Sequence, residues 1–339
     1  MTFDPNAPAA ADSGVFGLTD TPESAAVVLI PVPFEATTSY GRGTVNGPEA
    51  IWEASKQVDL FDLDTGRPYE RGIAMLDEPA EVRAWNNEAT ALAIPIIENA
   101  GVAEDPTALA KVNALSEKMN DWVYQTTRGL IAKGKFVGLV GGDHSTPFGC
   151  IKAHAEKFPG MGVLHLDAHA DLRDAYEGFT WSHASIMFNV MKHVPQVKTL
   201  TQVGIRDFGE AEFEIIQNSD GRIHTFFDSN LARKLLDGMP WREQVDAIIG
   251  TLPDQIYLSW DIDGLEPTLC PNTGTPVPGG LTFHQALGLL EGIHRAGKRI
   301  VGFDLNEVAP GETDEWDGNV GARLLYKMIG WMLKTQTRE

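Results

Sequence analysis

Short apolar runs, separated by polar or glycine-rich segments, dominate the hydrophobic pattern of this chain. Six of them have the length and the continuous apolar character of strands that are buried on both faces of a parallel sheet. They cover residues 25–32, 135–141, 161–167, 198–205, 255–261 and 298–305.

The segments between these runs predict helices. Apolar residues fall on one helical stripe over Lys111–Lys133, and Phe283–Ala296 and Val320–Leu333 also have helical patterns. Strands that alternate with helices indicate an α/β fold with a mostly parallel sheet covered on both faces. We expect one domain over residues 24–335, because no linker divides it, and a loose or surface-draped tail over residues 1–23, which are rich in Ala, Pro, Asp and Ser.

The charge of the chain narrows its possible partners. Its 339 residues include 27 Lys and Arg and 47 Asp and Glu, for a formal net charge of −20. Nucleic acids and anionic membranes both require a basic face, so neither is expected as a main partner. The negative field is compatible with a cationic substrate, although solubility alone also accounts for it.

The sequence also indicates a cellular compartment for the protein. Residues 1–14 lack the basic start and the apolar run of a secretory signal, and the apolar stretch Ala25–Phe34 is about half of the ~20 residues that span a bilayer. Cys150 and Cys270 are too few for a disulfide framework or a cysteine zinc site and suit a reducing compartment. We therefore expect a cytoplasmic protein.

Three of the predicted strands end in clusters of acidic residues and histidine. In open α/β sheets, ligands bind outside the carboxyl ends of the strands. An extended chain has a side-chain period of two, so Asp167, His169 and Asp171 point the same way, as do Asp261 and Asp263. The converging set is two imidazoles, His144 and His169, and four carboxylates, Asp167, Asp171, Asp261 and Asp263.

These six residues predict a pair of divalent metal ions. Four adjacent carboxylates repel one another unless cations hold them, and two divalent ions supply the matching charge. Carboxylates with some imidazole suit Mn²⁺, and a metal pair is an established hydrolytic device. Taken singly, an Asp-x-Asp is usually a solvated turn and a histidine in an apolar strand usually belongs to the core. Three such clusters at strand ends favour the metal interpretation.

The motifs resemble those of the ureohydrolases, the family of arginases, agmatinases and their relatives. The resemblance extends over residues 27–335 and implies a three-layer α-β-α fold, a binuclear manganese centre and homo-oligomers, commonly trimers or hexamers. It rests on VPFEATTSYGRGTVNGPEAI (32–51), GGDHS (141–145), LDAHADLRD (166–174), SWDIDGLEP (259–267), TGTPVPGGL (273–281) and DLNEVAP (304–310).

The resemblance also implies a role for each site residue. Asp167 and Asp261 would bridge the two ions, with Ni²⁺ not excluded by ligand type. The first ion would further bind His144 and Asp171, and the second His169 and Asp263.

Three residues resemble substrate-side groups of the family. His183 resembles a proton-relay histidine, Glu307 a glutamate that pairs with the guanidinium, and Thr275 a threonine near it. Without the resemblance these would be a loop histidine, a surface carboxylate and a turn residue. The remaining histidines are interpreted as structural, with His165 on the same strand face as Asp167 and so a candidate to support the site.

The implied reaction is hydrolysis of a guanidinium to urea and an amine. The guanidinium is always protonated and is a poor electrophile, so water at pH 7 needs activation, which a metal pair supplies. Glu307 would orient the cation, Asp171 would accept a hydrogen bond from the attacking water, and His183 would carry a proton toward the leaving amine.

The loop Ala175–Ser182 indicates agmatine as the substrate. It has no Asn to hold the α-carboxylate of arginine, whereas Glu177 and the faces of Tyr176, Phe179 and Trp181 could receive an ammonium group. Departures from the family pattern, such as an apparent insertion over residues 85–105, leave arginine, free guanidine, guanidinobutyrate and formiminoglutamate open. An acidic substrate would need a cation, for which Arg173 and Arg206 are candidates.

Other protein classes fit less well. A deacetylase of related architecture would use one zinc and fewer ligands, and a metallophosphatase would show a Gly-Asn-His cluster, which this sequence lacks. A non-catalytic binding protein on the same fold would be expected to have lost a ligand, and all six are present.

Overall fold

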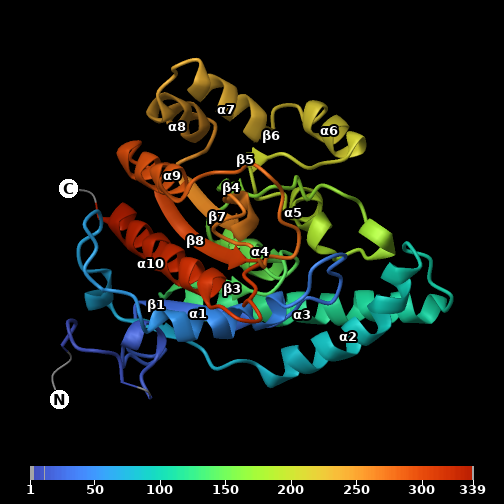
Figure 1. Ribbon diagram of the computed structural model, residues 1–339, viewed down its shortest axis with the longest axis horizontal. Coiled ribbons are helices and arrows are strands. Elements are labelled where there is room, and N and C mark those ends of the chain that lie inside the picture. The colour runs from blue at the N-terminus through green and yellow to red at the C-terminus, as the bar shows by residue number, and fades with distance from the viewer. Residues whose placement is uncertain (1–3, 11, 338–339) are drawn as a thin grey trace.

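Eight parallel strands form one sheet through the centre of the molecule (Figure 1). The computed structural model describes residues 4–10 and 12–337. Every neighbouring pair of strands is parallel, in the order β2-β1-β3-β8-β7-β4-β5-β6. The strands are β1 (Val27–Val32), β2 (Ile73–Met75), β3 (Phe136–Gly141), β4 (Gly162–Leu166), β5 (Thr199–Ile205), β6 (Ile223–Phe227), β7 (Gln255–Asp261) and β8 (Arg299–Asn306).

The six predicted strands correspond to β1, β3, β4, β5, β7 and β8. The apolar pattern does not predict β2 and β6, which form the two edges of the sheet. β2 has only three residues. Most of β6 is partly exposed, so it lacks the continuous apolar run of a central strand.

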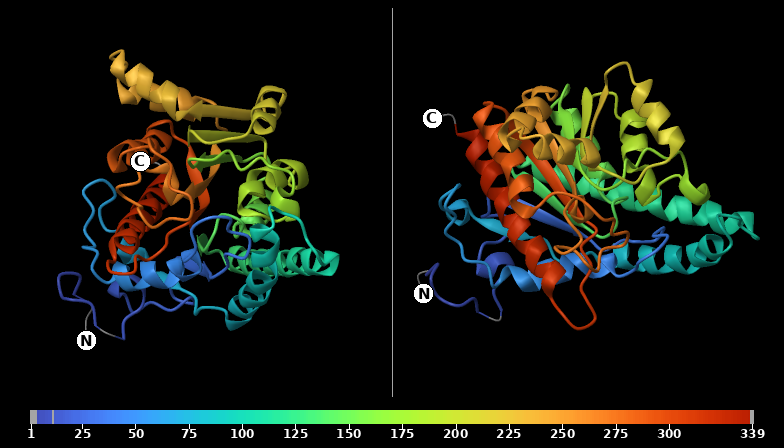
Figure 2. Two further views of the ribbon diagram at one scale, coloured as in Figure 1. Left: turned by 45° about the vertical axis from the view of Figure 1, so that its right-hand side comes forward. Right: turned by 45° about the horizontal axis from the view of Figure 1, so that its top comes forward.

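Helices cover both faces of the sheet, which confirms the predicted three-layer α-β-α fold (Figures 1 and 2). Side chains of β1 alternate between the two interfaces: Val27 and Leu29 pack in one apolar core, and Val28 and Ile30 pack in the other. Helices α1 (Gly47–Ser55), α7 (Asp228–Leu236), α8 (Trp241–Gly250), α9 (Phe283–Arg295) and α10 (Trp316–Gln336) contribute to the first core; α2 (Ala80–Glu98), α3 (Pro106–Ala132), α4 (Phe148–Lys157), α5 (Ile186–His193) and α6 (Glu210–Gln217) contribute to the second.

The predicted helices are present, and their starts have local causes. The Asp105 carboxylate accepts a hydrogen bond from the Thr107 N–H at 2.8 Å, and Pro106 follows it, so α3 begins earlier than the apolar stripe alone predicts. Thr282 and Gln285 form a reciprocal capping box at the start of α9.

Residues 85–105, which look inserted in the sequence, lie in α2 and in its connection to α3. The two helices pack against each other as a long hairpin at one side of the molecule (Figure 1). Val82, Ala89 and Ala93 face the second core, so α2 is part of the helical layer.

Part of the N-terminal tail is anchored on the domain. Val15, Phe16 and Leu18 are buried, and the ring of Phe16 lies 4.9 Å from that of Tyr326 in α10. The Phe16 N–H donates to the Ser55 hydroxyl at 2.8 Å. This segment is draped on the surface rather than loose, while residues 1–3 and 11 lie outside the described part.

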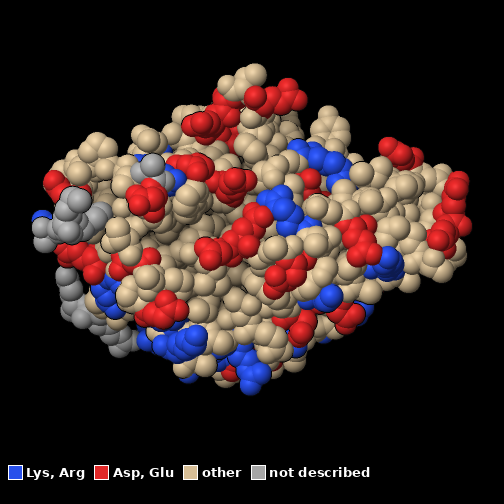
Figure 3. All heavy atoms as spheres, turned by 90° about the horizontal axis from the view of Figure 1, so that it is seen from below, with Lys and Arg blue, Asp and Glu red and all other residues tan. Residues whose placement is uncertain are grey.

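The outer surface carries both signs of charge. On the face in Figure 3, Lys and Arg side chains lie in small groups among Asp and Glu side chains. Of the helices described, none is both long enough and apolar enough to cross a bilayer.

Candidate active site

Four neighbouring strands bring the expected site residues to one edge of the sheet. β3, β8, β7 and β4 lie side by side in this order, so strands distant in sequence meet here. Carboxyl ends of parallel strands are where α/β proteins bind ligands. His144 follows β3, Asp167, His169 and Asp171 follow β4, Asp261 ends β7, Asp263 lies in the next turn, and Glu307 follows β8.

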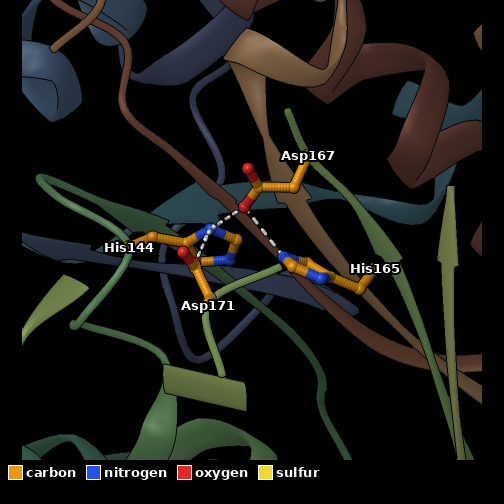
Figure 4. Close-up of side chains that lie close together, drawn as sticks. All are labelled: His144, His165, Asp167 and Asp171. Carbon is orange, nitrogen blue, oxygen red and sulfur yellow. Dashed lines mark hydrogen bonds and ion pairs between the residues drawn. The ribbon is translucent and has the colours of Figure 1, made fainter. Parts of the chain in front are cut away.

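Three carboxylates surround one imidazole nitrogen, and Figure 4 draws two of them, Asp167 and Asp171. His144 Nδ1 lies 3.0 Å from Asp167 Oδ2, 3.2 Å from Asp261 Oδ2 and 3.5 Å from Asp171 Oδ2. A single N–H cannot donate to three acceptors at once. The arrangement is that of donor atoms around a cation.

A second group shares Asp167 with the first. His169 Nδ1 lies 3.1 Å from Asp263 Oδ2 and 3.3 Å from Asp167 Oδ1. Asp167 thus presents one oxygen to each group, and the Asp263 Oδ2 atom is buried without a hydrogen-bond partner. Asp261 faces the first group through Oδ2, whereas its Oδ1 accepts the Asp263 N–H at 2.8 Å.

The cluster has more negative charge than its own imidazoles can balance. Burial raises the pKa of Asp171 well above its usual range, and the neighbouring Asp167 adds to this rise. Burial also raises the pKa of Asp261, assisted by Asp263. For His144, burial acts to lower the pKa, but the adjacent carboxylates outweigh it and the net shift is well upward. Divalent cations fit this set of oxygen and imidazole donors.

His165 supports the cluster from behind. The Gln202 amide N–H donates to the Ala170 carbonyl at 2.7 Å and lies 3.1 Å from His165 Nδ1, so this ring nitrogen acts as the acceptor. His165 Nε2–H then donates to Asp167 Oδ2 at 2.8 Å. His165 therefore orients the Asp167 carboxylate, which agrees with its expected place on the same strand face as Asp167.

Glu307 offers a free buried oxygen beside the cluster. Its Oε1 accepts the backbone N–H of His144 at 2.9 Å, and its carbonyl accepts the Thr273 hydroxyl at 2.7 Å. The other oxygen, Oε2, is buried without a hydrogen-bond partner. The backbone has φ of 62°, the left-handed region, so the tertiary structure holds Glu307 in an uncommon conformation.

A cleft of about 160 Å³ leads to the cluster. His183 and Thr275 line it, whereas Glu307, the third residue expected on the substrate side, is not among its lining residues. Burial lowers the pKa of His183 to about 4, and the nearby His169 adds to this effect. Its other lining residues are Ser39, His169, Asp171, Arg173, Tyr176, Ala184, Asp207 and Glu212.

The loop after Asp171 contributes less to the cleft than the sequence suggests. Of the segment Ala175–Ser182, Tyr176 alone is among the lining residues. The expectation that Phe179 and Trp181 receive a substrate cation is wrong, because Phe179 is fully buried in the core and Trp181 packs on Phe148 at 4.7 Å. Glu177 also lies outside the lining.

The two candidate arginines already have partners. Arg206 donates to the backbone carbonyls of Asp263 at 2.7 Å and Val277 at 2.9 Å, so it connects the two loops that contain these residues. Arg173 lies 3.3 Å from the Glu212 carboxylate and 4.6 Å from the Tyr176 ring. The structure therefore provides no uncommitted cation in the described cleft for an acidic substrate.

Three polar residues of the cleft escaped the sequence analysis. Asp207 follows β5, and pairing of its backbone with that of His169 brings it to the cleft. Glu212 is buried and accepts the Leu172 N–H at 3.0 Å. Ser39 comes from the loop after β1. The rule that sites lie at strand ends applies also to Asp207, but the sequence after β5 shows no cluster that would single it out.

Comparison with known proteins agrees with this geometry. A sequence model described as "Arginase family" matches residues 25–330. The chain belongs to the arginase family. The match covers every strand and all six residues of the cluster, which agrees with the resemblance found in the motifs.

Relatives within the arginase family carry ureohydrolase names. The N(1)-aminopropylagmatine ureohydrolase of Thermus thermophilus is 33% identical over 93% of this chain and 94% of its own. The agmatinase of Photorhabdus laumondii is 30% identical over 89% of this chain and 85% of its own. The agmatine ureohydrolase of Thermoplasma volcanium has the same fold, with a TM-score of 0.71 at 24% identity over 98% of this chain and 96% of that one. This arginase-family protein is accordingly a hydrolase acting on C–N bonds, as the motifs predict.

Proposed function

We propose that this chain hydrolyses agmatine to urea and putrescine. The observation that carries the proposal is the unpartnered buried oxygen of Glu307 beside the carboxylate and imidazole cluster. A guanidinium is a planar cation with donors in a fixed fork, and a buried carboxylate oxygen is a matching acceptor. The cleft reaches His169 and Asp171 of the cluster, although Glu307 is not one of its lining residues.

Two divalent cations, Mn²⁺ in the first place and Ni²⁺ as the alternative, fit the cluster. Asp167 would be the carboxylate that both ions share, and Asp261 would be the second. Bound cations lower the pKa of a coordinated water and so supply a nucleophile near neutral pH. The first ion would take His144, Asp171, Asp167 and Asp261, and the second His169, Asp263, Asp167 and Asp261.

The residues around the cluster would handle the substrate and its protons. Glu307 would hold the guanidinium so that the guanidinium carbon faces the cluster. Thr275, from another loop, would form the opposite wall of the guanidinium site. Asp171 would accept a hydrogen bond from the attacking water. His183, neutral at pH 7 because its pKa is about 4, would accept a proton and pass it toward the leaving amine.

A substrate with a cationic tail suits the cleft best. The cleft carries the exposed Asp207, and its one lining arginine, Arg173, is paired with Glu212. Arg206 is committed to backbone carbonyls. A carboxylate tail would meet acidic groups and would be left without a partner, which costs at least about 1–3 kcal/mol. The ammonium group of agmatine would instead lie near the negative charge of Asp207.

N(1)-aminopropylagmatine is the second candidate. The Thermus thermophilus relative that bears its name is 33% identical to this chain, more than the agmatinase at 30%. Its longer cationic tail would extend past Tyr176 and Asp207 into solvent.

Urea release from a panel of guanidines tests the proposal. The panel is agmatine, N(1)-aminopropylagmatine, arginine, guanidinobutyrate, formiminoglutamate and free guanidine. We expect kcat/KM for agmatine to exceed that for arginine by about tenfold to several hundredfold, since about 1.4 kcal/mol corresponds to tenfold. Equal turnover of arginine would refute the tail argument, and a clear preference for the aminopropyl compound would support the second candidate instead.

The oligomeric state and the cellular location of the protein stay predictions. The family resemblance implies a trimer or hexamer, and we propose the same for this chain, in the cytoplasm. Light scattering of the purified protein would measure its mass against that of one 36.9 kDa chain.

A further inference from the structure

The segment Ala175–Ser182, called here the cleft loop, has a strained backbone. Ala175 and Glu177 have φ of 51° and 54°, which side chains other than glycine rarely adopt, and Gly178 has φ of 85°. Such conformations persist only where surrounding contacts hold them. The contacts that hold this loop are therefore part of how the cleft is built.

The tip of the α2–α3 hairpin supplies contacts on one side of the cleft loop. Asn113 of α3 accepts the Thr180 N–H at 2.8 Å through Oδ1 and donates to the Gly178 carbonyl at 3.3 Å through Nδ2. Gly101, in the connection between α2 and α3, packs so closely that a Cβ there would lie 3.0 Å from Glu177 Cα. One side-chain amide thus pairs with two backbone groups of the cleft loop.

Contacts with the domain core and with α5 also fix the position of the cleft loop. The Phe179 side chain is fully buried, Asn189 of α5 donates to the Thr180 carbonyl at 2.8 Å, and the Tyr176 N–H lies 3.4 Å from the Ser185 hydroxyl that accepts it. Tyr176 is left facing the cleft, with its ring 6.3 Å from that of His183 in an edge-on arrangement.

We infer that the tip of the α2–α3 hairpin sets the position of the cleft loop, and that Asn113 is a positioning residue for the part of the substrate beyond its guanidinium. The inference rests on the proposed function, because Tyr176 lines the outer wall of the same cleft. The guanidinium would bind at Glu307 and the cluster, whose contacts come from the carboxyl ends of β3, β4, β7 and β8. The hairpin would therefore affect binding of the tail and leave binding of the guanidinium unchanged.

Variants of Asn113 test the substrate side of this inference. In Asn113→Ala, we expect KM for agmatine to rise about tenfold, as the loss of two hydrogen bonds implies, with kcat within about twofold. The inhibition constant of methylguanidine, which has no tail, should stay unchanged. Asn113→Asp keeps the acceptor for Thr180 and should restore part of the loss. Asn87→Ala, at an exposed position of α2, is the matched control and should behave as wild type.

Amide hydrogen exchange of residues 174–182 tests, without any substrate, whether Asn113 stabilises the cleft loop. Exchange of this segment should accelerate in Asn113→Ala and not in Asn87→Ala. Unchanged exchange would overturn the inference, as would equal weakening of agmatine and methylguanidine, which would indicate general damage to the site. If wild type released urea from no guanidine, the proposed function would fail, while the exchange result would still decide whether the hairpin holds the loop.

Discussion

His144 Nε2 lies 2.9 Å from the hydroxyl oxygen of Ser259. That hydroxyl lies 2.9 Å from the Asp304 carboxylate and donates its proton to it, so its oxygen accepts from the imidazole. His144 therefore carries a proton on Nε2, so that the ring in its neutral form leaves Nδ1 unprotonated for a metal ion. This is the tautomer that a metal ligand needs, and a serine on β7 selects it.

Ser259→Ala should weaken metal binding by roughly 10–100-fold, the usual cost of losing a group that orients a ligand. The cause is loss of the partner that holds the proton on Nε2. Competition with a chelator, followed by metal analysis, measures the change. Ser116→Ala removes another buried serine hydroxyl, one without a described partner, and should leave metal affinity unchanged. Equal affinity in both variants would contradict this role of Ser259.

Asp167→Asn should lower activity by several orders of magnitude while the fold survives. The side chain contributes one oxygen to each half of the cluster, so the variant removes the charge that both halves share. Metal analysis should show two equivalents per chain in the wild type and fewer in the variant, with circular dichroism unchanged. Asp121→Asn, on the exposed side of α3, serves as the control. Full activity in metal-free wild type would refute the two-metal interpretation.

Glu307→Gln should raise KM for agmatine by roughly 10–100-fold, because a charge-assisted hydrogen bond to the guanidinium is replaced by a neutral one. Glutamine can still accept the His144 backbone N–H, so the loop and the bound metal should be retained. Saturation kinetics and metal analysis on the same preparation separate the two effects. A variant that binds agmatine as wild type does would remove Glu307 from the guanidinium site.

His183→Ala should reduce kcat by about 10²-fold or more, within the usual contribution of a general acid or base, without loss of metal. The wild-type rate should rise from neutral to alkaline pH. The pKa of about 4 keeps His183 unprotonated over that whole range, so its own titration would not produce the rise. Loss of metal from the variant would show that His183 has a structural role.

The contribution of His154 to stability should fall below neutral pH, because this side chain is buried in α4. Burial lowers its pKa from 6.5 to about 4, so the unfolded chain binds a proton that the folded chain rejects. This contribution is intact above pH 6.5 and is lost progressively as pH falls toward 4. Between pH 7.5 and 5 the loss should reach about 2 kcal/mol, and His154→Gln should lack it. Denaturant unfolding of both proteins across this range gives the difference, and parallel curves would contradict it.

The pattern of apolar runs was sufficient for the six central strands and for the three-layer arrangement, because continuous burial on both faces leaves a strong local signal. It failed for β2 and β6, since edge strands are short or half exposed. The strand-end rule correctly placed His144, Asp167 and Asp263 in one site, and it needs no knowledge of the partner strand. The period of two did not hold there, because the chain is not extended: Asp171 has φ of 54° and Asp263 lies in a 3-10 turn.

What the sequence could not determine depends on contacts between distant residues. The orientation of Glu307 follows from a left-handed backbone held by the His144 N–H, 163 positions away. Arg206 is occupied by carbonyls of another loop, and Phe179 turns into the core rather than the cleft. Asn113 meets the cleft loop 65 positions further along the chain. Local periodicity thus specifies which residues share a strand face, whereas the packing of separate elements decides which side chains remain free to meet a substrate.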